Sequence, residues 1–150
     1  MPGTVLVVDR AAFLREEIGR LLEAGKWTVV AEADDGRDGL RLAFYHRPAL
    51  VVTELALPGL PGPEMIRHIK AALPFCRVVV CSALVQSRWV QEAVRAGADD
   101  FVVKPVDPER FLRAVGTVEP AGIADPASCA TAMEPAGAAE PEDALSGGAS

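Results

Sequence analysis

Short apolar runs alternate along residues 1–118 with longer segments in which apolar side chains recur every three or four positions. The runs predict five β-strands, at residues 4–8, 27–32, 49–54, 77–82 and 100–103. Runs that are apolar at nearly every position are typical of strands buried on both faces, as in a parallel sheet covered by helices. The pattern therefore predicts an α/β fold, with a doubly wound, five-stranded parallel sheet built from five βα units.

Glycine, proline and aspartate mark the expected ends of several helices. Gly25 is expected to form a left-handed cap after the first helix, and Gly97 caps the fourth. The fifth helix opens with Asp107 as its N-cap and Pro108 at its first position.

Charged residues stand at the ends of three of the predicted strands. Asp9 and Arg10 follow the first strand, Glu54 ends the third, and Lys104 follows the fifth. In open α/β sheets the ligand-binding crevice lies beyond the carboxyl ends of the strands. We therefore expect these four side chains to share one pocket, where function should be sought.

Composition divides the 150-residue chain near residue 118. Residues 1–118 hold all 15 Lys and Arg and 15 of the 21 acidic residues, whereas residues 119–150 hold the other six acids and no base. This second segment consists mainly of Ala, Pro, Gly, Ser and Glu, so it cannot bury enough apolar surface to offset the entropy of ordering. We predict a folded domain over 1–118 and a disordered acidic Ala/Pro/Gly-rich tail over 119–150. A partner-binding tail is the alternative.

The same composition disfavours several classes of protein. A neutral domain with an acidic tail lacks the basic face of a nucleic-acid binder, and no apolar run is long enough for a membrane span. No secretory signal is visible at the N-terminus. The three cysteines, Cys76, Cys81 and Cys129, show no metal-binding spacing, and Cys81 is expected in the core. A cytoplasmic location is expected.

Five motifs, each weak alone, occur in one order along the chain: Val5-Leu6-Val7-Val8-Asp9, Glu32-Ala33-Asp34-Asp35-Gly36, Pro58-Gly59-Leu60-Pro61-Gly62, Cys81-Ser82-Ala83, and Ala96-Gly97-Ala98-Asp99-Asp100-Phe101-Val102-Val103-Lys104-Pro105. With them, residues 4–118 resemble the receiver domain of two-component response regulators, the single-domain CheY-like type in particular. The resemblance implies a flavodoxin-like (βα)5 fold. In that family an aspartate after the third strand accepts a phosphoryl group from a histidine kinase, and nearby acids hold Mg²⁺.

The resemblance also implies roles for individual residues. Asp9 corresponds to the first metal-holding acid, and Ser82 to the hydroxyl that contacts the phosphoryl group. Lys104 corresponds to the lysine that pairs with this group, Pro105 to a cis-proline, and Phe101 to an aromatic that switches rotamer.

Two substitutions depart from the family pattern within this pocket. Glu54 occupies the phosphoacceptor position and Arg10 the position of the second acid, while Ala56 is a further position of the degraded metal site. Arg10 removes an oxygen ligand, so we expect no Mg²⁺ or only weak Mg²⁺ binding, and no other cofactor. We expect Arg10 to form a bidentate salt bridge with Glu54, although Glu54 also lies within plausible reach of Lys104 and Ser82.

These observations favour a phosphorylation-independent receiver domain, not an enzyme, that signals by contacting a protein, either a histidine kinase or a downstream signalling protein. The expected contact surface is the face of helix four, strand five and helix five, including Arg88, Trp89 and Phe101. Neither nucleic acid nor membrane is an expected partner, and the chain is expected to be a monomer or weak dimer.

Two other functions stay open. A working phosphorelay receiver would accept a phosphoryl group at or near Glu54, because Asp9 and Lys104 remain. A flavin- or nucleotide-binding enzyme would share the topology, but residues 9–13 lack a glycine- or hydroxyl-rich phosphate loop.

Other polar residues are expected to have structural roles. His46 and His68 fall on predicted helices away from the pocket, as surface positions rather than metal ligands. Residues 34–36 are interpreted as a turn and helix start, and residues 99–100 as a cap of the connection to the fifth strand.

Overall fold

The computed structural model describes residues 3–116, so the predicted tail lies outside the described residues. Five strands alternate with five helices. The strands are β1 (Thr4–Val8), β2 (Thr28–Ala33), β3 (Leu50–Thr53), β4 (Arg77–Ser82) and β5 (Asp100–Val103). The helices are α1 (Ala12–Ala24), α2 (Gly36–His46), α3 (Gly62–Ala72), α4 (Ser87–Ala96) and α5 (Pro108–Val115).

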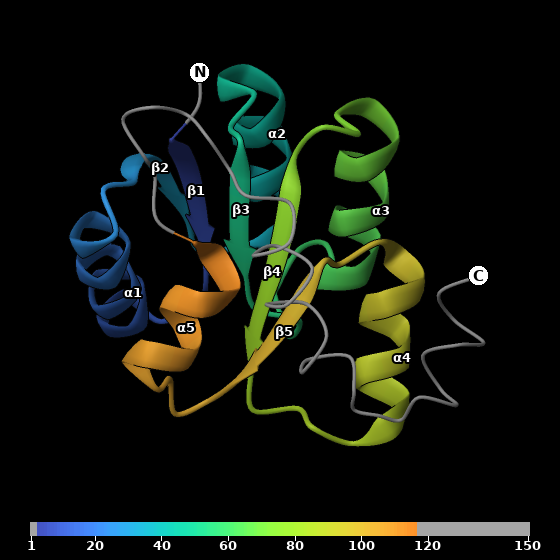
Figure 1. Cartoon of the computed structure of the whole chain (residues 1–150). Helices are drawn as coiled ribbons and strands as arrows, with labels where there is room; N and C mark the ends of the chain where they lie inside the picture. Colours follow the sequence, from blue (N-terminus) through green and yellow to red (C-terminus); the bar gives the residue numbers. More distant parts are fainter. Residues whose placement is uncertain (1–2, 117–150) are drawn as a thin grey trace.

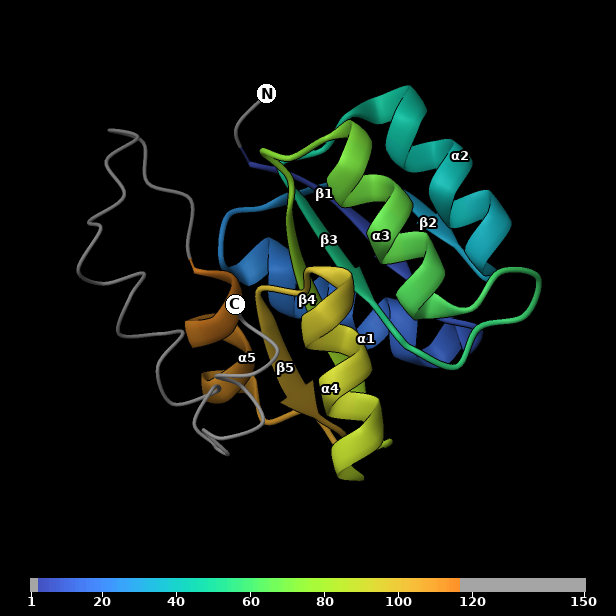
Figure 2. The same ribbon diagram turned by 90° about the vertical axis from the view of Figure 1, so that its right-hand side faces the viewer.

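All neighbouring strands are parallel, in the order β2-β1-β3-β4-β5, with α1 and α5 on one face of the sheet and α2, α3 and α4 on the other (Figures 1 and 2). This arrangement confirms the predicted doubly wound (βα)5 fold. It follows from parallel strands joined by right-handed helical crossovers. No helix among the described residues is long and apolar enough to cross a membrane.

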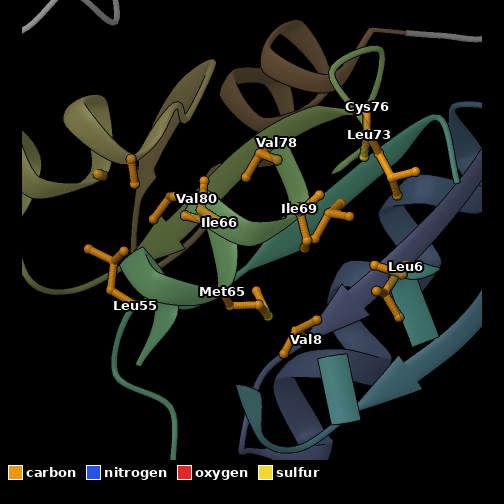
Figure 3. Close-up of a cluster of buried hydrophobic side chains, with 14 of the residues drawn as sticks. Leu6, Val8, Leu55, Met65, Ile66, Ile69, Leu73, Cys76, Val78 and Val80 are labelled. Atoms are coloured by element: carbon orange, nitrogen blue, oxygen red, sulfur yellow. The ribbon is translucent and has the colours of Figure 1, made fainter. Parts of the chain in front are cut away.

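Alternate residues of each strand supply two separate cores. On one face, Leu6 and Val8 of β1 pack with Met65, Ile66 and other residues of α2, α3 and α4 (Figure 3). On the opposite face, α1 and α5 pack against the intervening strand positions. The helices contribute Ile18, Leu22 and Phe111, and the strands contribute Val5, Val7, Val52 and Cys81, among others. The sheet is therefore buried on both sides, as the uninterrupted apolar runs predicted.

Most helix ends follow the sequence expectation, but one does not. Asp107 caps α5 by accepting a hydrogen bond from the Arg110 backbone N–H at 2.9 Å, and Gly97 has the left-handed φ of 112° after α4. Gly25 has φ −87°, so the prediction of a left-handed cap there was wrong. The next residue, Lys26, takes the positive φ instead. Gly25 is buried, and a Cβ at this position would lie 3.2 Å from Leu112 Cδ2, so close packing favours the glycine.

Candidate functional site

The sheet places Asp9, Glu54 and Lys104 together at the carboxyl ends of its strands. The backbone N–H of Asp9 donates to Ala33 O, that of Glu54 to Val8 O and that of Lys104 to Ser82 O, each at 3.0 Å. These bonds continue the parallel ladders by one residue beyond β1, β3 and β5. The three charged side chains therefore start from backbone positions that the sheet itself fixes.

The Lys104 ammonium group joins the two carboxylates. Its Nζ atom lies 2.7 Å from Glu54 Oε1 and 2.8 Å from Asp9 Oδ2. The Lys104 side chain is 13% exposed, that of Glu54 10% and that of Asp9 2%. Short ion pairs with so little exposure are screened far less than surface pairs.

The remaining carboxylate oxygens are bound to backbone N–H groups. Glu54 Oε2 accepts from Leu55 N at 2.7 Å and from Ala56 N at 3.3 Å, while Asp9 Oδ1 accepts from Ala11 N at 2.9 Å. Ala56 thus contributes a backbone donor to the pocket. All four carboxylate oxygens have a partner from the chain itself.

These contacts set the protonation states of the pocket. Burial alone would raise the pKa of Glu54, but the hydrogen bonds from Lys104, Ser82 and the Leu55 backbone, together with the Lys104 charge, outweigh burial and lower it. Burial would likewise lower the pKa of Lys104, and the hydrogen bonds and charges of Asp9 and Glu54 raise it. Glu54 is therefore an anion and Lys104 a cation at neutral pH.

The predicted salt bridge between Arg10 and Glu54 was wrong. Arg10 is exposed, and its side chain forms no ion pair or hydrogen bond with any residue of 3–116. Lys104 reaches Glu54 from a buried strand end, whereas pairing with Arg10 would require the guanidinium to leave water.

The sequence reasoning also missed Arg15, whose Nη1 donates to Asp9 O at 2.6 Å and whose Nε lies 3.1 Å from Glu32 Oε1. Its position in α1, six residues after Asp9, was the only available signal.

Three further predicted residues lie around this pair. Ser82 is fully buried, and its Oγ accepts from Leu84 N at 3.0 Å as well as lying close enough to Glu54 to lower the pKa of that carboxyl. The Lys104–Pro105 peptide bond is cis, as the resemblance implied. Phe101 is half-buried against the core beneath α3 and α4.

Arg88 and Trp89 lie on α4, as expected. Trp89 is partly buried against the core beneath α4. The Arg88 guanidinium lies 4.9 Å from the centroid of the Trp89 ring, a cation–π contact on the surface.

The other predicted polar residues have structural partners. Asp35 caps α2 by accepting from Asp38 N at 2.8 Å, which confirms the helix start. Asp99 accepts from Val78 N and Lys70 Nζ, and buried Asp100 pairs with Arg110. His68 is exposed and His46 partly so, both on helices.

Asp34, Asp35 and Asp38 lie close enough together to hold a cation. However, the Asp35 carboxylate caps α2 by accepting a hydrogen bond from Asp38 N, and Asp38 pairs with Arg41 at 3.1 Å. Nothing further at this cluster points to a metal.

The residues of the pocket do not fit the Mg²⁺ that the family resemblance implies. Mg²⁺ requires near-octahedral oxygen ligands and usually takes one or two carboxylates. Here Lys104 neutralises Asp9 and Glu54, their other oxygens bind backbone N–H groups, and Arg10 offers no oxygen. A cation would have to displace the ammonium group to gain its ligands.

The stabilising effect of the Glu54 carboxylate is expected to depend on pH and to disappear in acid. Because its pKa lies below the ordinary 4.5 in the folded chain, its contribution is present above pH 4.5 and is lost as the pH falls through the lowered value. Glu54→Gln should cost about 1.5–3 kcal/mol at pH 7, the usual size for hydrogen bonds to a charged group. Urea unfolding of both proteins from about pH 3 to pH 8 should show this difference shrink as Glu54 protonates. Glu32→Gln, at the more exposed Arg15 pair, is the matched control and should cost less than about 1 kcal/mol. A difference that stays constant with pH would contradict the assignment.

Comparison with known proteins agrees with this fold. The sequence profile of the family described as "Response regulator receiver domain" matches residues 5–116. The chemotaxis protein CheY of Bacillus subtilis is 36% identical over 115 residues, which cover 77% of this chain and 96% of that protein. The protein CcdB of the same organism is 39% identical over 114 residues, covering 76% and 95%.

Solved structures show the same fold. The receiver domain of AraT from Geobacillus stearothermophilus has a TM-score of 0.68 at 34% identity, covering 74% of this chain and 88% of that one. CheY in a CheX–CheY–BeF3–Mg complex from Borrelia burgdorferi has a TM-score of 0.72 at 25% identity, covering 77% and 87%. The chain thus belongs to the response regulator receiver domains of two-component signalling.

Proposed function

We propose that this receiver domain signals without phosphorylation, through contacts with a protein partner. The observation that carries the proposal is the Lys104 ammonium group held between Glu54 and Asp9 at 2.7 and 2.8 Å. In the family this lysine pairs with the phosphoryl group. Here two internal carboxylates take that place.

The pocket is also poorly arranged for phosphoryl transfer. Such transfer depends on positioning the nucleophile and on neutralising charge. Glu54 is one methylene longer than aspartate, and its Oε2 atom is turned back to the Leu55 and Ala56 N–H groups. Arg10 brings positive charge without an oxygen ligand. Each feature opposes attack by Glu54 on a phosphodonor.

The proposed contact surface is the face formed by α4, β5 and α5. Arg88 and Trp89 present a stacked cation and aromatic ring there, and half-buried Phe101 lies on β5. Aromatic residues and arginine are enriched where proteins bind one another. The CheY relative from Borrelia burgdorferi, bound to CheX, is an example of a receiver that contacts a protein.

A phosphodonor assay tests the proposal. The full chain is incubated with acetyl phosphate and Mg²⁺, and its intact mass is measured beside that of the Bacillus subtilis CheY relative. The expected result is no mass gain for this chain. A stoichiometric gain of one phosphoryl group would refute the proposal, and its loss in Glu54→Gln would assign the acceptor to Glu54, as the alternative of a working phosphorelay receiver requires.

A further inference from the structure

Three exposed aromatic side chains stand where α2 and α3 end, at the end of the sheet opposite the pocket. Helices run antiparallel to the strands in this fold, so α2, α3 and α5 all end where β3 and β4 begin (Figure 1). Phe44 and Tyr45 in the last turn of α2 are 44% and 79% exposed, and Phe75 after α3 is 56% exposed. Large apolar groups clustered in water mark an interaction surface.

One cation–π contact and one backbone hydrogen bond join the end of α2 to the segment before β4. The Arg47 guanidinium lies 5.6 Å from the centroid of the Phe75 ring, and Arg77 N donates to Ala49 O at 3.0 Å. The end of α2 and the start of β4 are therefore adjacent. We call Phe44, Tyr45, Arg47 and Phe75 the aromatic patch.

The surroundings of the aromatic patch contain few acidic residues. Between positions 39 and 91 the only acids are Glu54 and Glu64, and both lie at the other end of the sheet, one after β3 and one in the first turn of α3. Three acids do lie at the same end: Asp99 is paired with Lys70, Asp100 is paired with Arg110, and Glu23 is on α1, across the sheet. Arg47 has no ion pair with any described residue. The patch thus suits a segment with negative charge and some apolar side chains.

The chain leaves the domain beside this patch. The Arg77 guanidinium donates to Ala114 O at 2.8 Å and to Val115 O at 3.2 Å, which fixes the end of α5 against the start of β4. On the other side, Trp27 Nε1 donates to Gly116 O at 2.7 Å. Gly116, the last described residue, therefore lies between the aromatic patch and residues 25–28.

The sequence that follows has the complementary character. Residues 119–150 contain six acids and no base, with Glu140, Glu142 and Asp143 close together shortly before Leu145. A random coil as long as the stretch from Gly116 to Glu140 spans roughly 25–30 Å. This reach is comparable with the width of a domain whose radius of gyration is about 13 Å. Tethering at such a distance gives an effective concentration of about a millimolar, so even weak contacts would be populated.

We propose that the acidic segment 119–150 docks on the aromatic patch of its own chain. Its carboxylates meet Arg47, and its few apolar side chains meet the exposed rings. This is the partner-binding alternative for the tail, with the same molecule as partner. It does not depend on the proposed function, because the patch and the pocket lie at opposite ends of the sheet.

Cys129 provides a selective probe in the unaltered full chain. Cys76 and Cys81 are buried, and burial raises their pKa to about 11 and about 12, so a thiol-specific nitroxide reacts with Cys129. Paramagnetic broadening of backbone amide signals then reports where the segment spends its time. The expected result is stronger broadening of residues 44–47 and 75 than of residues 25–28. Both groups flank the exit of the chain, so a free tail would broaden them alike or favour 25–28.

Salt and charge changes complete the test. Raising the ionic strength from about 0.01 M to about 1 M shortens the screening length from about 30 Å to about 3 Å, and should remove the excess broadening. Glu140→Gln with Glu142→Gln and Asp143→Asn should do the same, as should Arg47→Ser. The matched control is Glu16→Gln with Glu17→Gln on α1, which should change nothing. Equal broadening of both groups, or broadening insensitive to salt and to these substitutions, would overturn the proposal. So would broadening that appears only between differently labelled molecules, since this would place the contact between copies.

Discussion

Replacing Lys104 with methionine is expected to lower the free energy of unfolding by about 3–5 kcal/mol at pH 7, the usual cost of removing one partner of a buried ion pair. Methionine keeps most of the apolar stem, so the loss reports the ammonium group. Without it, the carboxylates of Asp9 and Glu54 face each other with little access to water. Urea unfolding at pH 7 measures the change.

Acid should partly rescue the Lys104→Met variant. Without its cation, buried Glu54 has a raised pKa, so protonation occurs at a higher pH than in the unfolded chain and stabilises the variant as the pH falls. The parent chain instead loses stability as the pH falls, because the pKa of its Glu54 is lowered. Adding Glu54→Gln to Lys104→Met should recover part of the loss at pH 7 for the same reason.

A matched control separates the pocket from ordinary ion pairs. Lys70 pairs with Asp99 at 3.1 Å, where the side chains are 23% and 30% exposed. Lys70→Met should cost less than Lys104→Met and should show no rescue by acid. A loss below about 1 kcal/mol for Lys104→Met, as at a surface pair, would contradict the buried bridge.

The fold was predictable because its signals are local and repeated. Apolar runs and helical spacing recur five times, and Asp107 and Gly97 mark helix ends by chemistry that acts within a few residues. Gly25 shows the limit of this reasoning. The sequence indicates that a glycine follows α1, but only the packed Leu112 side chain reveals that space, rather than a positive φ, is the reason.

The pocket was predictable in its location but not in its pairing. Strand ends bring Asp9, Glu54 and Lys104 together by topology alone. Which cation binds Glu54 depends on burial, because Lys104 extends from the sheet edge while Arg10 stays in water. The aromatic patch was not foreseen, since Arg47 and Phe75 are distant in sequence and meet only because β3 and β4 are neighbours in the sheet.

Changing Arg10→Asp together with Glu54→Asp is expected to convert a chain that takes no phosphate into one that gains one phosphoryl group per molecule. Shortening residue 54 by one methylene withdraws its carboxylate from the Leu55 and Ala56 N–H groups that now hold it. Arg10→Asp adds a carboxylate at a position that now carries a guanidinium. The pocket would then hold three carboxylates against the single charge of Lys104, a donor set that suits Mg²⁺.

Intact mass after incubation with acetyl phosphate and Mg²⁺ gives the result, and isothermal titration with Mg²⁺ reports the metal site separately. The single variants are the controls. Arg10→Asp alone keeps the overlong Glu54, and Glu54→Asp alone keeps a guanidinium beside the pocket, so each should gain little or no phosphoryl group. Because Ser82, Lys104 and the cis Lys104–Pro105 bond are already in place, no further change should be needed. A double variant that binds Mg²⁺ yet takes no phosphate would show that the barrier lies elsewhere, with Arg15 on Asp9 O the first contact to test.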